Sequence, residues 1–225
     1  MRRHHAAAAL IRPAAESAMA AADDATDDGA DLAGLVLALI GSRQSVMPKR
    51  LLAPGPDDAQ LRQMVDAAAC APDHRGLRPW RLVRIADGQR AALADLFEAC
   101  TRERDPAATP DDIARSREKA LRAPVLLLAV LRGEPPDDDV PLVERAITLG
   151  AALMNLLLAA HGMGHGAMLT SGRAVRTPRF AQAFALAPGE QAVCFVSIGR
   201  APAVAPRRAR GAAADFLADW VPPAA

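Results

Sequence analysis

The feature that most restricts the fold of this chain is an apolar stretch from Val143 to His161, VERAITLGAALMNLLLAAH. After Glu144 and Arg145 it carries no charge, and Asn155 is its only strongly polar interior residue. A helix that is apolar nearly all round is buried on most sides. A membrane span needs about 20 predominantly apolar residues, and this stretch is shorter and interrupted by Gly150. It therefore predicts a core helix, shared between subunits, in preference to a membrane span.

The composition fits one domain and argues against nucleic-acid binding and against a disulfide framework. A chain of 225 residues has the length of one ordinary domain. The formal net charge of +1 and the aromatic content of 3% give no electrostatic or stacking basis for binding nucleic acid. Cys70, Cys100 and Cys194 are odd in number, far apart and without metal-ligand spacing. They argue against a disulfide framework and indicate a reducing cytoplasm.

The first 31 residues differ from the rest. They are rich in alanine and contain an acidic patch. Arg2 and Arg3 before alanines resemble the start of an export signal, but Arg12 and Glu16 interrupt the apolar region, which in a signal runs for about 7–15 residues. We predict a flexible extension over residues 1–31, with export as the alternative, followed by one domain over residues 32–222.

The rest of the pattern alternates long helices with apolar strands. This order favours an α/β or α+β domain of two or three layers. The run VLLLAVL after Pro124 predicts a buried strand without an exposed face. Besides the central helix, helices are expected at 31–40, 57–71, 89–104, 111–122 and 178–185, and strands at 81–86, 125–131, 167–170 and 192–198.

Two turns carry candidate binding chemistry. Arg43-Gln44-Ser45 directly follows a predicted helix, and such a basic, hydroxyl-bearing turn holds phosphate by charge-assisted hydrogen bonds. Leu169-Thr170-Ser171-Gly172 follows a predicted strand, where backbone N–H groups face a ligand. The residues alone indicate a site for a phosphate-bearing cofactor and go no further.

Other motifs argue against competing chemistries. The glycines from Gly162 to Gly166 lie between a helix and a strand, the reverse of the order in a dinucleotide-binding loop. His161 and His165 lack a third ligand, so we expect no metal site. The chain has no nucleophile elbow of the G-x-S-x-G type. Asp73-His74 is open to two interpretations, a solvated turn or a functional histidine.

The order of several short motifs resembles the nitroreductase family, above all its compact, single-domain bacterial members. None of the motifs is specific alone, but together they cover about residues 32–220. They are R-x-S at 43–45, Ala71-Pro72-Asp73-His74 followed by Pro79-Trp80, Arg122-Ala123-Pro124 before a strand, the long apolar helix, the G-x-G turn, Thr170-Ser171-Gly172, and DF-x3-W at 215–220.

The resemblance implies an α+β fold of three layers, in which helices flank a central, mostly antiparallel sheet. It implies a domain-swapped homodimer around the long helix, with FMN at two interfacial sites. The composition and the short apolar stretch, for their part, lead us to expect no nucleic acid or membrane partner. The resemblance also implies electron transfer from NADH or NADPH to nitro compounds, quinones or similar small-molecule acceptors. Three alternatives remain: a flavin-sequestering protein without turnover, a specialised flavin dehydrogenase or dehalogenase, and an apo structural dimer, which would be colourless.

Carried over residue by residue, Arg43 and Ser45 resemble contacts to the FMN phosphate and ribityl chain. Gln44 lies between them, where relatives often have arginine. Leu169, Thr170 and Ser171 correspond to the segment along the flavin ring, where relatives often have tryptophan-arginine-serine.

Three further positions complete the implied FMN set. The N–H of Ser171 or Gly172 would donate to flavin N5 or O4, and His74 and Cys70 would line the flavin from either subunit. Arg207, Arg208 and Arg210 follow the last strand, either as a basic segment at the phosphate, with Arg208 foremost, or as a solvated linker. No catalytic acid or base is implied, because the flavin carries out the hydride chemistry.

Overall fold

The structure is a computed structural model that describes residues 28–133, 139–202 and 209–223. The chain divides into two compact units, residues 1–42 and residues 43–225. The described part of the first unit is helix α2 (Asp28–Ser42), which confirms the helix predicted at 31–40. This helix begins within the segment predicted to be a flexible extension, and residues 1–27 of that segment lie outside the described residues.

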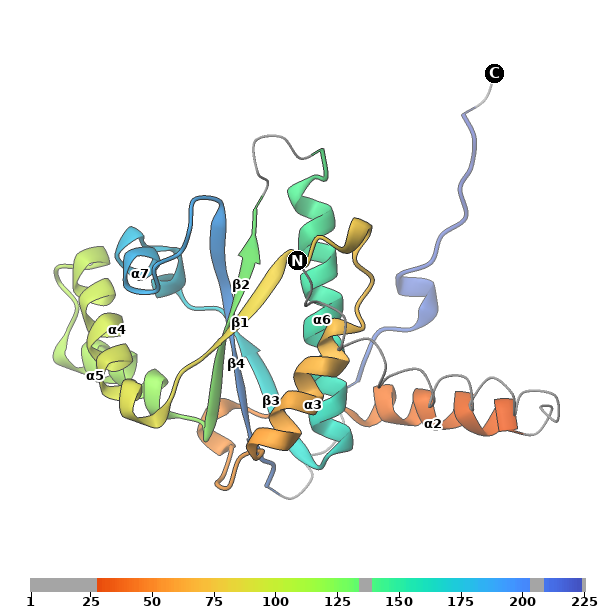
Figure 1. The fold of residues 1–225 in the computed structure, drawn as a ribbon, viewed down its shortest axis with the longest axis horizontal. Coiled ribbons are helices and arrows are strands. Elements are labelled where there is room, and N and C mark those ends of the chain that lie inside the picture. Colours follow the sequence, from red (N-terminus) through yellow and green to blue (C-terminus); the bar gives the residue numbers. More distant parts are fainter. Residues whose placement is uncertain (1–27, 134–138, 203–208, 224–225) are drawn as a thin grey trace, which may run out of the picture. The chain divides into compact units, whose positions relative to one another are not determined.

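The second unit is built on a four-stranded antiparallel sheet with the order β1-β2-β4-β3 (Figure 1). The strands are β1 (Trp80–Arg84), β2 (Val125–Arg132), β3 (His165–Thr170) and β4 (Glu190–Arg200). β2 pairs with β1 and β4 and is buried from Val125 to Leu131. Layers on both faces cover it, which is why its sequence shows no alternation.

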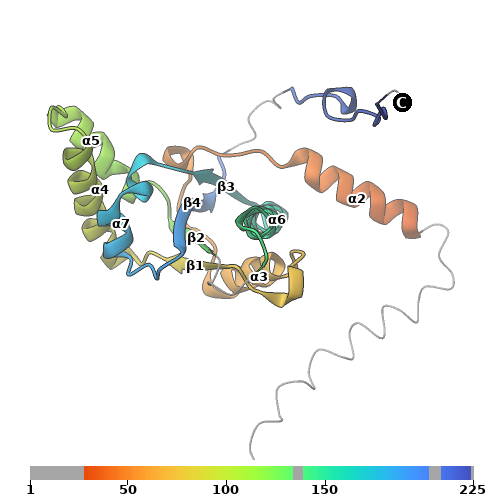
Figure 2. The same cartoon turned by 90° about the horizontal axis from the view of Figure 1, so that it is seen from above.

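Helices cover both faces of this sheet (Figure 2). α3 (Asp58–Ala69) and α6 (Leu142–Gly162) pack on one face, where the core includes Leu127, Leu156 and Val196. On the other face, α4 (Arg90–Arg104), α5 (Pro110–Glu118) and α7 (Pro178–Ala183) enclose a core that includes Phe97 and Phe195. The expected α+β fold of three layers with an antiparallel sheet is confirmed.

Local sequence signals explain where several elements begin and end. Asp57 accepts a hydrogen bond from the backbone N–H of Gln60, and the Gln60 side chain accepts from the N–H of Asp57, so the two form a capping box at the start of α3. The helix predicted at 111–122 is shorter than expected. α5 ends at Glu118, and a 3-10 turn (Lys119–Leu121) leads to Ala123-Pro124. The residue before proline avoids helical backbone.

The predicted central helix is α6, and its two sides have different environments. Leu149, Leu153 and Leu156 are buried against the sheet and α3. Val143 and Ile147 are instead 63% and 66% exposed. By length and composition α6 could cross a membrane, yet it packs as a core helix. It therefore leaves an apolar stripe uncovered on the single chain.

A loop segment from Arg43 to Leu52 is fixed at the β3 edge of the sheet. The N–H of Val46 donates to the carbonyl of Ala167 at 3.1 Å, and Leu52 exchanges backbone hydrogen bonds with Arg200 at 3.0 and 2.8 Å. A Cβ on Gly166 would lie 2.9 Å from Val46 Cγ2, closer than side chains pack. Glycine at this position allows the segment to lie against β3.

Candidate functional site

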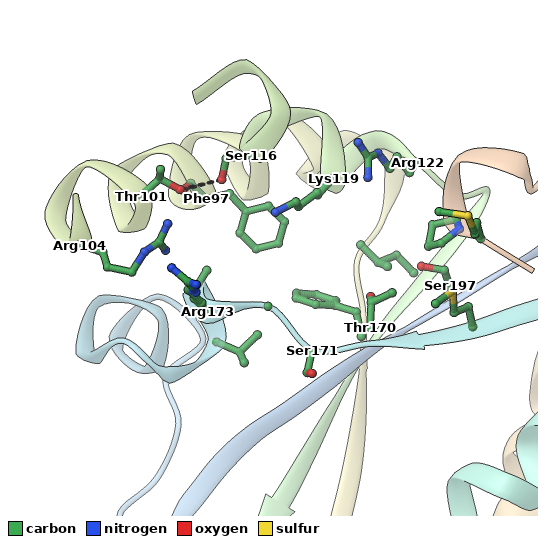
Figure 3. Close-up of a pocket in the computed structure, with 18 residues that line it drawn as sticks. Phe97, Thr101, Arg104, Ser116, Lys119, Arg122, Thr170, Ser171, Arg173 and Ser197 are labelled. Atoms are coloured by element: carbon green, nitrogen blue, oxygen red, sulfur yellow. Dashed lines mark hydrogen bonds between the residues drawn. The ribbon is translucent and has the colours of Figure 1, made fainter. Parts of the chain in front are cut away.

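A cavity of about 550 Å³ lies between the sheet and the layer formed by α4 and α5, beside the end of β3 (Figure 3). Its volume falls within the range of small-molecule and cofactor sites. Three of the predicted residues line it, namely Thr170, Ser171 and Gly172. The loop residues Met47 and Pro48 line it as well, so the cavity begins two residues after the Arg43-Gln44-Ser45 turn.

Most of the cavity wall is apolar. Phe97 and Phe195 meet edge to face with ring centroids 5.7 Å apart, and Leu126, Met168 and Val175 complete the apolar lining. Met168 and Thr170 lie two residues apart on β3 and therefore share one face of the strand. This surface suits a flat, largely apolar ring system.

Three buried hydroxyl groups line this wall, and two of them are satisfied by the fold. Thr101 Oγ1 lies 2.8 Å from Ser116 Oγ, and both lie within 3.1 Å of the Phe97 carbonyl oxygen. Ser197 is 2% exposed, and its hydroxyl has no side-chain hydrogen bond to the part of the chain that the structure describes. Figure 3 shows the Ser197 side chain directed into the cavity. Buried polar groups are rarely left unpaired, so this hydroxyl is available to a ligand.

The charged residues of the lining are all basic. Arg104, Lys119, Arg122 and Arg173 line the cavity, and no Asp or Glu is among the described lining residues. Arg122 is paired with Glu118 at 2.7 Å, but its Nε is buried without a hydrogen-bond partner in the structure as described. The cavity therefore favours a ligand that carries negative charge.

A pair of arginines lies at the Arg43 turn, outside the cavity lining. Arg210 donates from Nη2 to the backbone carbonyl of Arg43 at 3.0 Å. Burial, followed by the nearby charge of Arg210, lowers the pKa of Arg43. The Nε of Arg43 is buried without a partner among the described residues, and neither arginine pairs with a described carboxylate. Two adjacent guanidinium groups without a carboxylate are suited to bind a phosphate.

The single chain does not bring every predicted residue to the cavity. Leu169 packs instead against the core beneath α6. Cys70 is exposed at the end of α3, and its Sγ donates to the carbonyl of Asp66 at 3.5 Å. His74 is exposed, with Nδ1 2.9 Å from Glu144 Oε2. Gln44 is half-buried and Ser45 is exposed within the Arg43–Leu52 segment. Arg207 and Arg208 lie outside the described residues.

Several cavity residues were missed in the sequence. The four basic lining residues come from α4, the turn after α5 and the turn after β3, and no short motif connects these distant positions. Ser197 did carry a signal, because it is a hydroxyl residue inside the otherwise apolar run AVCFVSIG.

Known proteins resemble this chain in sequence. The sequence model of the nitroreductase family matches residues 40–200. The Escherichia coli K12 protein YdjA, named as a putative NAD(P)H nitroreductase, is 30% identical over 165 residues, which cover 72% of this chain and 86% of YdjA. A 5,6-dimethylbenzimidazole synthase from Rhodospirillum rubrum is 30% identical over 154 residues, covering 64% of this chain and 72% of the synthase.

Solved structures share the fold. A nitroreductase-like family protein from Bacillus cereus matches with a TM-score of 0.69 and 20% identity, over 81% of this chain and 94% of that one. A Desulfovibrio desulfuricans protein solved in complex with FMN matches with a TM-score of 0.62 and 25% identity, over 84% of this chain and 98% of that one.

Proposed function

The chain belongs to the nitroreductase family, and we propose that it is an FMN-dependent oxidoreductase that uses NADH or NADPH to reduce nitro compounds, quinones or similar acceptors. The observation that carries this proposal is the apolar cavity beside β3. Its lining begins at Met47, in the same segment as the Arg43 turn, where Arg43 and Arg210 pair with no described carboxylate. Bound FMN would supply hydride transfer, while the protein binds and orients it.

The residues present fit the two ends of FMN, its phosphate and its ring system. The guanidinium groups of Arg43 and Arg210 supply donors for the phosphate, with Ser45 in the same turn. The apolar wall formed by Phe97, Phe195 and Leu126 offers a surface for the ring system. The unpartnered hydroxyl of Ser197 and the exposed segment at Ser171-Gly172 provide polar contacts at its edge.

The positive charge that relatives place in two motif positions is absent at Gln44 and Thr170. Basic residues elsewhere compensate in this chain. Arg210 adjoins the predicted phosphate site, and Lys119 and Arg122 line the cavity. A phosphate in a partly buried site needs such partners, because an unpaired buried charge is costly.

Assembly belongs to the same proposal. We infer a domain-swapped homodimer in the cytoplasm, in which the apolar stripe of α6 is covered by a second copy. Cys70 and His74 do not line the cavity of their own chain, so any contact with the flavin would cross the subunit interface. The exposed position of His74 beside the start of α6 supports this arrangement.

The test combines a spectrum with a turnover assay. The purified protein should show the visible absorption of bound flavin and release FMN on denaturation. It should then oxidise NADH or NADPH when a neutral quinone such as menadione is added. Flavin without turnover would favour the flavin-sequestering alternative, and protein that neither retains nor rebinds FMN would refute the proposal.

The Rhodospirillum rubrum relative supports a second candidate, a specialised flavin enzyme of the same fold. Its name assigns synthesis of 5,6-dimethylbenzimidazole to that protein, and the identity equals that of YdjA. For this chain, the candidate predicts bound FMN but slow reduction of general quinones. Comparing menadione turnover with the formation of 5,6-dimethylbenzimidazole by the FMN-loaded protein separates the two candidates.

A further inference from the structure

Two arginines of the cavity lining are exposed and make no polar side-chain contact with the described part of the chain. Arg104 is the last residue of α4, and Arg173 begins the 3-10 helix η6 (Arg173–Arg176) after β3. Neither forms an ion pair or a side-chain hydrogen bond within the described residues. The neighbouring carboxylate of Glu103 is already paired with Arg179 at 2.8 Å, so it does not neutralise them.

Arg90, by contrast, is an arginine with a structural role. Its guanidinium is buried and donates to the carbonyls of Ala120, Ala123 and Pro124 at 3.0 to 3.2 Å. Arg104 and Arg173 are instead exposed at the cavity wall, and their donors have no partner among the described residues. Figure 3 shows both side chains on the side of the cavity away from Ser197.

These two arginines are also separate from the cationic pair assigned to the FMN phosphate. Arg43 and Arg210 adjoin the loop that leads to Met47. Arg104 and Arg173 come from α4 and η6, which contact each other, and they adjoin the apolar lining at Phe97 and Val175. The cavity therefore has positive charge that one flavin phosphate at the Arg43 turn does not use.

We propose that Arg104 and Arg173 form a subsite for an anionic group, a carboxylate or a phosphate, carried by a molecule other than FMN. This subsite rests on the proposed function, which assigns the FMN phosphate to Arg43 and Arg210. The anion belongs either to an aromatic electron acceptor whose ring packs on the apolar wall or to the nicotinamide dinucleotide. Such an acceptor carries a carboxylate and the dinucleotide carries phosphates, and a guanidinium group can donate two hydrogen bonds to either anion.

The experiment compares two acceptors of nearly equal shape, anionic 4-nitrobenzoate and neutral 4-nitrobenzamide. Their dissociation constants are measured by calorimetry on the FMN-loaded protein and on the double variant Arg104→Gln/Arg173→Gln. The matched control, Arg102→Gln/Arg176→Gln, removes two charges from the same helix and the same turn, outside the cavity lining. FMN affinity and the KM for NADH and NADPH are measured on all proteins.

We expect the parent protein and the control to prefer the benzoate by roughly tenfold at low salt, since exposed charge pairs give modest gains. The double variant should bind the two acceptors equally, and Arg104→Lys/Arg173→Lys should restore part of the preference. If the double variant instead raises only the KM of the dinucleotides, the subsite is upheld and its anion is the dinucleotide phosphate.

Two results would overturn the inference. One is a double variant indistinguishable from the control in all these constants. The other is a selective loss of FMN affinity, because this would place the flavin phosphate at Arg104 and Arg173. Failure of the proposed function appears separately, as protein that binds no FMN, and the two acceptors can still be compared by calorimetry on that protein.

Discussion

Single residues of this chain show two uses of charge, one within the fold and one toward a ligand. Glu190 accepts two hydrogen bonds from Arg81, at 2.8 and 2.7 Å, and only 11% of its side chain is exposed. Arg43 and Arg210 meet without any described carboxylate. The first arrangement connects strands β1 and β4 of the sheet, whereas the second brings two cations together, which the proposed FMN phosphate would neutralise.

The Arg43 assignment gives the first prediction. Arg43→Gln should weaken FMN binding by about tenfold to a hundredfold, because it removes a charge-assisted bond worth roughly 1.5–3 kcal/mol. The loss should be smaller at high salt, where screening already weakens the parent. Fluorescence titration with FMN measures both effects. Arg50→Gln is the control, since Arg50 is exposed within the same loop segment, and equal losses in the two variants would refute the assignment.

Glu190 gives a prediction about stability and pH. The Arg81 hydrogen bonds lower the pKa of Glu190 from 4.5 to about 2. Because the folded-state pKa lies below the unfolded one, the stabilisation is complete above about pH 4.5 and is lost as the pH falls toward 2. Glu190→Gln should therefore lower the free energy of unfolding by about 2 kcal/mol at pH 7 and by much less at pH 2.

Urea unfolding at several pH values measures this difference. Glu118→Gln is the matched control, because Glu118 pairs with Arg122 at 2.7 Å but is 56% exposed. An exposed pair contributes about 0–1 kcal/mol. A Glu190→Gln variant that is as stable as the control at pH 7 would show that the Arg81 pair contributes little.

At the scale of elements, the Arg43–Leu52 segment is the link between sheet and site. Its backbone pairs with Ala167 and Arg200, and Gly166 permits the close approach. Gly166→Ala would place Cβ at 2.9 Å from Val46 Cγ2 and 3.0 Å from Leu51 Cδ2. We expect the segment to shift and FMN affinity to fall several-fold, with a loss of stability of about 1–3 kcal/mol.

Flavin titration and thermal unfolding check this expectation together. Gly88→Ala is the control, because a Cβ there meets nothing within 4 Å. If Gly166→Ala binds FMN as tightly as Gly88→Ala, the segment does not position the phosphate site.

The elements were more predictable than the cavity. β2 and α6 are specified by continuous apolar runs, and α3 by the Asp57 capping box, all of which are local patterns. The cavity depends on which face of β3 meets α4 and α5, and this is set by packing between distant segments. Thr170 and Ser171 belong to a short turn motif, so the sequence predicts them as part of the site. Lys119 and Arg173 also line the cavity, but they belong to no such motif and were not predicted.

At the scale of the whole molecule, the exposed apolar surface requires an explanation. Val143 and Ile147 on α6 are more than half exposed, and so are Phe216, Leu217 and Trp220 near the C-terminus. Apolar patches of this kind on a single chain mark association surfaces. We therefore expect an obligate homodimer with an interface in the class of about 2,000–5,000 Å².

Ile147 allows this expectation to be tested on one side chain. On an isolated chain Ile147 is 66% exposed, so Ile147→Asp should cost a monomer little. In a dimer with α6 at the interface, the same change buries an unpaired carboxylate, which is strongly unfavourable. Light scattering at micromolar concentration should report a dimer for the parent and a monomer for Ile147→Asp. Leu121→Asp, at a position that is 62% exposed beyond α5, should remain dimeric.

The flavin gives this test a second readout. If Cys70 and His74 reach the FMN of the partner, the monomeric variant should also bind FMN more weakly, although its own Arg43 and cavity lining are unchanged. Retained FMN affinity in a monomer would limit the cofactor contacts to one chain, as the cavity lining alone would allow. A parent protein that is monomeric at this concentration would refute the dimer, and the apolar stripe of α6 would then need a different partner.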